Sequence, residues 1–240
     1  MSGPARPWAP ATRRGLSWKI ELADSLPSDP ESGRVNRPAE RIFGVVLAGG
    51  RSRRFGRSKV LTPLAGAPMA SWSIRTLQAA DLPVGGVSDE EGVDVVLGAP
   101  VRPDLEAGLG PLGGLWTALQ WALERGDQGV LLIGCDMPLV SDRLVRTVLN
   151  WSDTAAAVVP MGSDGPEPLC ALYRLSCAPE VERRLRSEEL SLRGLAEAVG
   201  AASISHEKVA EVADPLNAFL NVNTTGERDR AEALLVSTLS

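Results

Sequence analysis

Residues 42–48 read Ile-Phe-Gly-Val-Val-Leu-Ala and lead directly into Gly49 and Gly50. A short apolar run that ends in glycines is typical of a buried strand feeding a tight loop. The run Gly129–Gly134, with the sequence Gly-Val-Leu-Leu-Ile-Gly, has the same character and is followed closely by Asp136. Buried strands of this kind are typical of parallel sheets covered by helices, and such sheets bind ligands at the carboxyl ends of their strands.

Predicted helices and strands alternate along the rest of the chain. Apolar side chains at helical spacing and capping serines predict helices over residues 69–80, 112–124, 141–151, 191–199 and 227–239. Short apolar runs predict further strands over residues 93–97, 155–159, 169–173 and 218–222. Strands that alternate with helices indicate an α/β sandwich built around a mostly parallel sheet.

The composition of the 240 residues supports a folded core and argues against several classes of protein. Hydrophobic residues make up 44% of the chain and charged residues 23%, which argues against disorder throughout. The net charge of −5 argues against a protein that binds nucleic acid over its whole surface. No stretch approaches the roughly 18 apolar residues that a membrane-spanning helix needs.

Cysteine and histidine usage narrows the kinds of site further. The 3 cysteines are an odd number without metal-ligand spacing, which predicts a reducing compartment, the cytoplasm, and no disulfide scaffold. Cys135 has no basic neighbour in the sequence, so we expect a buried structural residue rather than a nucleophile. His206 is the single histidine, and no Gly-x-Ser-x-Gly sequence accompanies it, so neither a histidine-rich metal site nor a serine hydrolase triad is expected.

Residues 1–40 differ from the rest of the chain. They contain six prolines and show no sustained apolar periodicity. We therefore predict a disordered N-terminal extension over residues 1–40 and one folded domain over residues 41–240. Residues 1–20 contain no Asp or Glu but lack the apolar stretch of a secretory signal, so a targeting peptide is the less favoured alternative.

A strongly basic loop follows the first predicted strand. Four arginines and Lys59 lie within the nine residues 51–59, in a chain whose net charge is negative. Glycine N–H groups at the start of the loop can face phosphate oxygens, so the segment predicts an anion-binding site. The spacing of Gly50 and Gly56 does not match a Walker A loop, and a solvated basic turn is the alternative interpretation.

A second glycine-rich segment opens the helix predicted over residues 112–124. Gly108, Gly110 and Gly113 form a Gly-x-Gly-x-x-Gly pattern, and Asp136 follows after about twenty residues, as in a dinucleotide-binding site. The glycines do not follow a predicted strand directly, which weakens this interpretation. The start of a helix still offers N–H groups to an anion or to the edge of a base.

Two further segments carry polar side chains suited to ligand binding. Asp136 stands at the end of a buried strand, where a carboxylate is a natural ligand for Mg²⁺ beside substrate phosphates. Its alternative role is to cap the turn before Pro138. In an extended run Asn221 and Asn223 point to the same face, where their amides can recognise a heterocycle or a phosphate. Their alternative role is to end a strand and to cap the last helix.

These segments occur together in one order along the chain. They are Leu47-Ala-Gly-Gly with Arg54-Phe-Gly and Lys59, Asp104 with Gly110-Pro-Leu-Gly-Gly, Cys135-Asp-Met-Pro, Pro168-Leu-Cys-Ala-Leu-Tyr173, Ser191-Leu-Arg193 and Asn221-Val-Asn-Thr224. In this ordered set the chain resembles the molybdenum cofactor guanylyltransferases, from about residue 42 to the C-terminus. The resemblance implies a three-layer α/β/α sandwich with a mostly parallel, Rossmann-like sheet of the nucleotidyltransferase type.

The resemblance also implies a reaction and its participants. The family transfers GMP from GTP to the phosphate of molybdopterin and releases pyrophosphate, with Mg²⁺ as cofactor and with molybdoenzymes or their chaperones as possible further partners. By this likeness Lys59, helped by Arg54, would neutralise the GTP phosphates, and Asp136 would bind Mg²⁺ and orient the α-phosphate. Residues implied for GTP binding are Leu47, Ala48 and Gly49 (through their backbone to guanine), Gly50, Lys59, Asp104 (to the nucleoside), Gly110, Pro111, Leu112 and Asp136, and those for molybdopterin are Asn221 and Asn223.

The chain departs from the family pattern at two positions. Ser58 replaces the Asp that many members carry before the loop lysine, which would lower Mg²⁺ binding or rate if that Asp assists the metal. Gly113 replaces the usual Ala of Gly-Pro-Leu-Ala-Gly. Relatives that transfer CMP tend to read Leu-Ala-Ala-Gly in the first loop, so Gly49 favours GTP. The alternatives are a transferase for CTP or another phosphate acceptor, an NAD-binding oxidoreductase, and a nucleotide-binding partner without catalytic activity.

Overall fold

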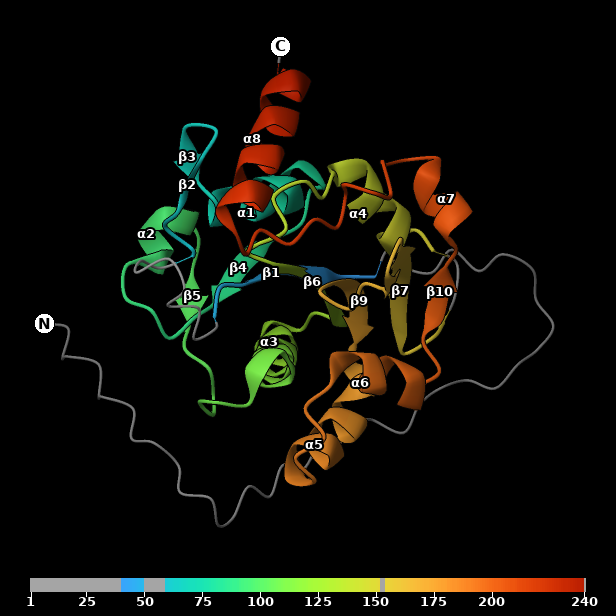
Figure 1. Cartoon of the computed structure of the whole chain (residues 1–240). Helices are drawn as coiled ribbons and strands as arrows, with labels where there is room; N and C mark the ends of the chain where they lie inside the picture. Colours follow the sequence, from blue (N-terminus) through green and yellow to red (C-terminus); the bar gives the residue numbers. More distant parts are fainter. Residues whose placement is uncertain (1–39, 50–58, 152–153, 240) are drawn as a thin grey trace, which may run out of the picture. The chain divides into compact units, whose positions relative to one another are not determined.

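The computed structural model of the chain describes residues 40–49, 59–151 and 154–239. The predicted extension over residues 1–40, except for residue 40, and most of the basic loop lie outside these described residues. In the described part an eight-stranded sheet has the strand order β10-β7-β9-β6-β1-β4-β5, and β8 pairs with β7 at its side (Figure 1). The strands are β1 (Ile42–Leu47), β4 (Val84–Val87), β5 (Val101–Arg102), β6 (Gly129–Gly134), β7 (Ala157–Gly162), β8 (Gly165–Pro166), β9 (Cys170–Arg174) and β10 (Ala202–Ile204).

The sheet is mostly parallel, as the sequence predicts. Strand β1 is parallel to both of its neighbours, β4 and β6, and the outer pairs β4–β5 and β7–β10 are parallel as well. Two strands are exceptions: β9 runs antiparallel to both β6 and β7, and the short β8 runs antiparallel to β7. The two buried strands that the sequence identifies most clearly, β1 and β6, therefore lie side by side and end at the same edge.

Helices cover both faces of the sheet, which confirms the three-layer α/β/α sandwich. Figure 1 shows α1 (Ala70–Ala79), α4 (Asp142–Leu149) and α7 (His206–Ala210) on one side of the sheet. It shows α3 (Gly110–Arg125), α5 (Ala178–Arg186) and α6 (Leu192–Ala198) on the other side. No helix among the described residues is both long enough and apolar enough to span a membrane.

Strand β1 is apolar throughout because both of its faces are buried. On one face Val46 belongs to the large apolar cluster that also contains Leu77 of α1. On the other face Phe43 packs edge-on against Trp121 of α3, with ring centroids 4.8 Å apart. A strand that is covered on both sides buries every side chain, so its sequence reads as a continuous apolar run instead of an alternating one.

A smaller apolar cluster joins the C-terminal helix to the segment that follows Lys59. Helix α8 (Thr225–Leu239) packs against the two-stranded hairpin of β2 (Pro63–Leu64) and β3 (Ala67–Pro68). The cluster consists of Leu64, Met69, Val222, Ala231 and Leu235. Glu232 of α8 also accepts a hydrogen bond from the backbone N–H of Ala65, at 3.1 Å. These contacts hold two parts of the chain that are far apart in the sequence next to each other.

The prediction of a strand over residues 93–97 is wrong, because this segment forms the short helix α2 (Val93–Leu97). Only the positions four residues apart, Val93 and Leu97, are buried, whereas Val95 is 80% exposed. The strand at this place in the chain is instead β4, with the sequence Val-Gly-Gly-Val. Glycines are unfavourable in strands, so local preference gave no signal for β4.

The prediction of a last strand over residues 218–222 is also wrong. A turn over residues 215–219 ends within this segment, and residues 220–222 are irregular, with one backbone hydrogen bond of 2.9 Å from Val222 N–H to the Asp136 carbonyl. The predicted serine caps are confirmed. Ser141 Oγ accepts a hydrogen bond from Leu144 N–H at 3.2 Å, and Ser191 Oγ accepts one from Gly194 N–H at 3.1 Å.

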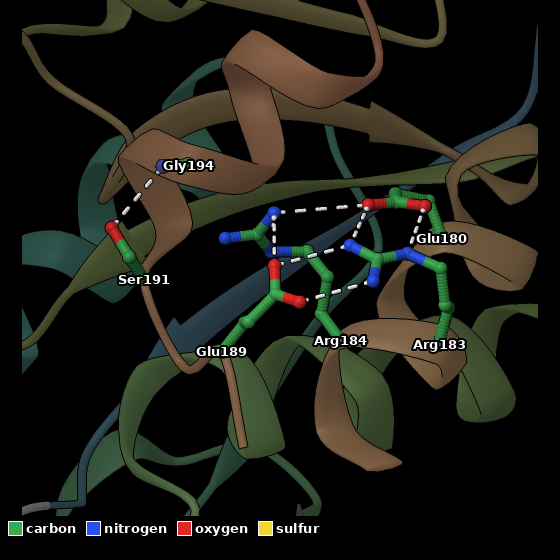
Figure 2. A network of polar contacts seen from close by, with 6 residues as sticks. All are labelled: Glu180, Arg183, Arg184, Glu189, Ser191 and Gly194. Carbon is green, nitrogen blue, oxygen red and sulfur yellow. Dashed lines mark hydrogen bonds and ion pairs between the residues drawn. The ribbon is translucent and has the colours of Figure 1, made fainter. Parts of the chain in front are cut away.

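A network of ion pairs fastens α5 to the turn that precedes α6 (Figure 2). Arg183 lies 2.8 Å from Glu180 Oε1 and 3.0 Å from Glu189 Oε1, and Arg184 Nη1 lies 3.2 Å from Glu189 Oε2. Arg184 is buried, and its guanidinium fills the space where a side chain at Gly194 would otherwise stand. The network links α5 to Glu189 through several charges at once, which isolated surface pairs do not do.

The packing around β4 predicts that Gly85→Ala destabilises the fold. A Cβ atom at this position would lie 2.6 Å from Trp121 Cη2 and 2.7 Å from Phe43 Cζ, so the two rings would have to move. Overpacking of this kind costs about 1–3 kcal/mol of unfolding free energy. Urea unfolding checks the prediction, with Gly226→Ala as the control, because a Cβ there would meet no atom within 4 Å. Equal stability of the two variants would contradict this packing.

Candidate functional site

Three side chains from distant parts of the chain meet where β6 ends. Lys59 Nζ donates hydrogen bonds to Asp136 Oδ2, at 3.0 Å, and to Asn223 Oδ1, at 2.5 Å. The side chains of Lys59 and Asp136 are only 13% and 20% exposed, so solvent and salt screen this ion pair weakly. The structure thus brings together residues that the sequence assigns separately to phosphate, metal and second-substrate binding.

Backbone contacts hold Asn223 in this position. The N–H of the preceding residue, Val222, donates to the carbonyl of Asp136 at 2.9 Å. Glu227 accepts hydrogen bonds from the N–H groups of Asn223 and Thr224, at 2.7 and 2.8 Å, and Thr224 Oγ1 accepts one from Glu227 N–H at 3.2 Å. This reciprocal capping box fixes the start of α8 and holds the pKa of Glu227 below its usual value.

The sequence suggests that Asn221 and Asn223 present free amides on one face of a strand. The structure differs, because both amides form hydrogen bonds within an irregular segment. Asn223 Nδ2 donates to the carbonyl of Asn221, at 3.2 Å, and Asn221 Nδ2 donates to the carbonyl of Phe219, at 3.3 Å. Asn223 Oδ1 is taken up by Lys59. Each amide is therefore oriented by the backbone two residues earlier. Both residues still line one cavity of about 440 Å³.

The segment Leu47-Ala-Gly49 runs out of the sheet at this same edge. The carbonyl of Leu47 accepts a hydrogen bond from Cys135 N–H at 3.0 Å, and Ala48 N–H donates to the carbonyl of Val87 at 2.9 Å. The carbonyl of Ala48 accepts from Ser88 Oγ at 2.8 Å. Gly49 is exposed and forms no backbone hydrogen bond with another described residue. Of the three residues predicted to hold the base, Gly49 therefore has the most accessible backbone.

Asp104 lies against two glycines beside this segment. A Cβ atom at Gly49 would be 4.0 Å from Asp104 Oδ2, and one at Gly114 would be 3.6 Å from Asp104 Oδ1. Oδ1 is buried and has no hydrogen-bond partner among the described residues. Burial, and after it the negative charge of Asp89, raises the pKa of Asp104 to about 6, against a smaller opposing effect of Thr117. An unpaired buried acceptor of this kind is suited to an N–H or O–H donor of a ligand.

The predicted glycine-rich contacts lie at the start of α3. Gly110, whose φ is +61°, and Pro111 are exposed there, whereas the Leu112 side chain is fully buried and only its backbone could face a ligand. The departure at Gly113 has a steric reason, because a Cβ at this position would lie 2.7 Å from Leu109 Cβ. Gly50 and Arg54, which the sequence also assigns to the site, lie outside the described residues.

Cys135, beside Asp136, is not placed to react. All three cysteines are unpaired and buried. Burial, and after it the charge of Asp136, raises the pKa of the Cys135 thiol to about 12. A thiol with so high a pKa is not the thiolate that nucleophilic chemistry needs, so the structure confirms the prediction of a structural cysteine.

The arrangement around Asp136 suits a metal ion whose coordination shell is completed by phosphate oxygens of a substrate. The described residues contain no group of three or more His, Cys, Asp or Glu side chains that could hold a metal by themselves. Asp136 uses Oδ2 to accept the hydrogen bond from Lys59, which leaves Oδ1 as the oxygen for a metal ion. Mg²⁺ commonly takes one or two carboxylates and completes its shell with phosphate oxygens and water, so this donor set suits it.

The cavity of about 440 Å³ contains residues that sequence analysis did not identify. Besides the two asparagines, Glu167, Phe219 and Arg230 line it. Glu167 stands directly before the Pro168-Leu segment, and no motif marked it as a site residue. A wider hollow of about 700 Å³ lies beside α2 and is bordered by Ser88, which bonds to the carbonyl of Ala48.

Comparison with known proteins identifies one family for most of the chain. Residues 44–207 match the family described as "MobA-like NTP transferase domain". A probable molybdenum cofactor guanylyltransferase of Pelotomaculum thermopropionicum is 33% identical over 193 residues, which cover 80% of this chain and 92% of that protein. A molybdenum cofactor guanylyltransferase of Rhodobacter capsulatus is 31% identical over 198 residues, which cover 80% of this chain and 95% of that protein.

A solved structure agrees with these relatives. The crystal structure of molybdopterin-guanine dinucleotide biosynthesis protein A from Archaeoglobus fulgidus superposes with a TM-score of 0.69 at 26% sequence identity. The match covers 82% of this chain and 100% of that one. The similarity therefore extends over the whole sandwich and is not restricted to the nucleotide-binding loops.

The raised pKa of Asp104 predicts that Asp104→Asn stabilises the ligand-free protein at neutral pH. Because the folded-state pKa, about 6, lies above the ordinary value of 3.8, ionisation of this carboxyl costs stability as the pH rises. The Asp104→Asn variant should melt at a higher temperature than the wild type above pH 6, and the difference should shrink as the pH falls from about 6 to about 4. Thermal melts over this range check it, with the exposed Asp164→Asn as control. A difference that does not depend on pH would contradict the prediction.

Proposed function

Since this chain belongs to the MobA-like NTP transferase family, we propose that it transfers GMP from GTP to the phosphate of molybdenum-bearing molybdopterin and releases pyrophosphate. It is a nucleotidyltransferase of the molybdenum cofactor guanylyltransferase type. The relatives with that name match it over nearly their whole length. An NAD-binding oxidoreductase has no support, because the Gly108–Gly113 segment opens α3 without following a long strand.

One observation carries the proposal: the ammonium group of Lys59 is held between the Asp136 carboxylate and the Asn223 amide. Nucleotidyl transfer joins two polyanions, so the protein must bring negative groups together. A cation fixed from two sides is already oriented before the substrates arrive, so little reorganisation is needed when charge develops. By its resemblance to the family, the chain would use Lys59 in this role, with Arg54 as its helper.

The chemistry needs positioning and charge neutralisation more than proton transfer. A phosphate oxygen of molybdopterin attacks the α-phosphorus of GTP, one P–O bond forms, and the bond to the pyrophosphate leaving group breaks. The nucleophile is already an anion, so no side chain has to act as a general base. Effective molarity from correct placement and electrostatic stabilisation together supply most of the acceleration in reactions of this kind.

The residues around Lys59 divide the remaining tasks. Asp136 would hold Mg²⁺ together with phosphate oxygens of the nucleotide, and the ion would neutralise charge on the α-phosphate. Asp104 offers its unpaired oxygen to a donor of the nucleoside, and Gly49 offers its backbone beside it. Asn221 and Asn223 border the cavity that would take molybdopterin. Molybdoenzymes or their chaperones would receive the product in the cytoplasm.

Gly49 favours GTP over CTP as the nucleotide. A Cβ at this position would come within 4.0 Å of Asp104 Oδ2 and would narrow the space between the loop and that carboxylate. A purine is larger than a pyrimidine, so the absence of a side chain suits guanine. A cytidylyltransferase with the same metal site is the second candidate, and nucleotide binding separates the two.

Calorimetry with GTP and CTP, each with and without Mg²⁺, tests the choice of nucleotide. We expect GTP to bind more tightly than CTP and Mg²⁺ to strengthen its binding, because the ion and Lys59 would share the phosphate charge. Preference for CTP would assign the chain to the second candidate. Failure to bind either nucleotide would contradict the proposal as a whole.

Replacement of Lys59 by Ala tests the role of the central cation. We expect the rate of pyrophosphate release from GTP and molybdopterin to fall by roughly 10²- to 10³-fold, as is typical when one electrostatic group of a transition state is removed. Lys208→Ala is the matched control, because Lys208 is exposed on α7 and pairs only with Glu211 among the described residues. Full turnover by the Lys59→Ala enzyme would refute the assignment.

A further inference from the structure

The cavity of about 440 Å³ beside Lys59 has an acidic lining. Asp164, Glu167 and Glu227 border it, against the single basic residue Arg230. Asn223, which also lines it, connects it to Lys59 and through Lys59 to Asp136. An anionic group of a ligand is therefore attracted to the Lys59 end, whereas the carboxylates elsewhere in the lining are suited to hydrogen-bond donors of a ligand.

Glu167 differs from the other two carboxylates. Glu227 is committed to the cap of α8, and Asp164 is exposed on the turn between β7 and β8. The Glu167 side chain is half-buried, and its carboxylate accepts no hydrogen bond from another described residue. Burial raises the pKa of Glu167, and the charge of Arg193 opposes this shift. Because no described residue donates to it, this carboxylate remains available to the N–H groups of a ligand in the cavity.

The backbone holds Glu167 firmly. Its N–H donates to the carbonyl of Pro160 at 2.9 Å, and its carbonyl accepts from Cys170 N–H at 3.0 Å. Gly162 of β7 makes room for the side chain, since a Cβ there would lie 3.0 Å from Glu167 Oε1 and 2.9 Å from Phe219 Cδ2. The carboxylate and the edge of the Phe219 ring thus share one wall of the cavity. The acceptor is placed before any ligand binds, which lowers the entropic cost of binding.

We propose that Glu167 accepts two hydrogen bonds from the 2-amino-4-oxopyrimidine edge of the pterin, one from its 2-amino group and one from its ring N3–H. The inference rests on the proposed function, and it fixes the direction in which the second substrate lies. The pterin ring faces Glu167, and the phosphate at the other end of the molecule faces Lys59. Glu167 then selects pterins through the neutral ring, independently of the phosphate.

The geometry of the two partners supports this pairing. A carboxylate presents two parallel acceptor oxygens and no donor, and the pterin edge presents two parallel N–H donors. Charge-assisted, bidentate pairs of this kind are among the strongest hydrogen bonds in proteins. A lumazine carries an oxo group in place of the 2-amino group, so it would turn one donor into an acceptor and place it against a carboxylate oxygen. A site built in this way rejects such an analogue strongly.

Glu167→Gln tests the pairing through the choice between neopterin and the lumazine with the same side chain. The wild-type protein should bind neopterin about 10- to 100-fold more tightly than the lumazine, which is the usual range for a hydrogen bond to a charged group. The Glu167→Gln protein should reverse or abolish this preference, because an amide can donate to the 2-oxo group and accept from N3–H. Glu167→Asp keeps the carboxylate and should keep the order of the two ligands. Fluorescence titration of the full-length wild type and of both variants measures the affinity of each protein for neopterin and for the lumazine.

Steady-state kinetics give the second measurement. Glu167→Gln should raise the KM for molybdopterin by about 10- to 100-fold and leave the KM for GTP within about two-fold of the wild type. Glu197→Gln, an exposed glutamate on α6 outside the cavity, is the matched control and should change neither value. Thermal melts show whether the Glu167→Gln protein is folded.

The outcomes separate this inference from the proposed function. If the wild type transfers GMP but Glu167→Gln changes neither the KM for molybdopterin nor the preference between the two ring systems, the role of Glu167 is refuted alone. If the wild type prefers neopterin through Glu167 but releases no pyrophosphate from GTP, the proposed transfer is refuted and the pterin site stands. A wild-type protein that binds neopterin and the lumazine equally would overturn the inference directly.

Discussion

The ion pair between Lys59 and Asp136, extended to Asn223, is the interaction on which the site depends. A charged lysine that is largely shielded from water is tolerated because a carboxylate and an amide accept hydrogen bonds from its ammonium group. Removal of either partner would leave a poorly solvated charge. The three residues come from the segment before β2, the end of β6 and the turn before α8. Their meeting therefore requires that the C-terminal part of the chain is folded in place, and the apolar cluster between α8 and the β2–β3 hairpin provides this.

The parallel register of β1 and β6 sets the rest of the geometry. Leu47 lies beside Gly134, so the two strands leave the sheet together, and the bond from Cys135 N–H to the Leu47 carbonyl extends the ladder by one step. Gly49 and Asp136 consequently follow neighbouring strands at one edge. An α/β sheet binds ligands at this edge because only there do loops, helix starts and strand ends converge.

The sequence predicts the mostly parallel sandwich, which the structure confirms, and it also predicts a set of site residues, of which the structure places three in contact. Lys59, Asp136 and Asn223 carry chemistry that reads directly from residue type and position, and the structure brings them into contact. The strand β4 was missed and the strand over residues 93–97 was wrongly predicted for related reasons. The glycines of β4 have little strand preference, but they allow close packing against Trp121 and Leu97, and Leu97 is buried there as part of the helix α2. Residue type and position in the sequence could not identify Glu167 as a site residue. Its proposed role depends on the cavity around it, which is lined by segments far apart in the sequence, and on the lack of a described residue that donates to its carboxylate.

The proposed roles of Asp104 and Glu167 follow one physical rule. Guanine and a pterin share the same 2-amino-4-oxopyrimidine edge, whose parallel N–H groups call for a carboxylate. Both residues are partly buried acceptors with raised pKa values, one beside Gly49 and the other in the cavity of Asn223. In the free protein, burial disfavours the ionised form of each carboxyl group, and a hydrogen-bond donor from a ligand would favour it. These residues would therefore lower the stability of the free protein at the positions where they recognise a ligand. In the proposed arrangement a chain of net charge −5 would bind two polyanions, because these two carboxylates would face the neutral rings and Lys59 would face the phosphates.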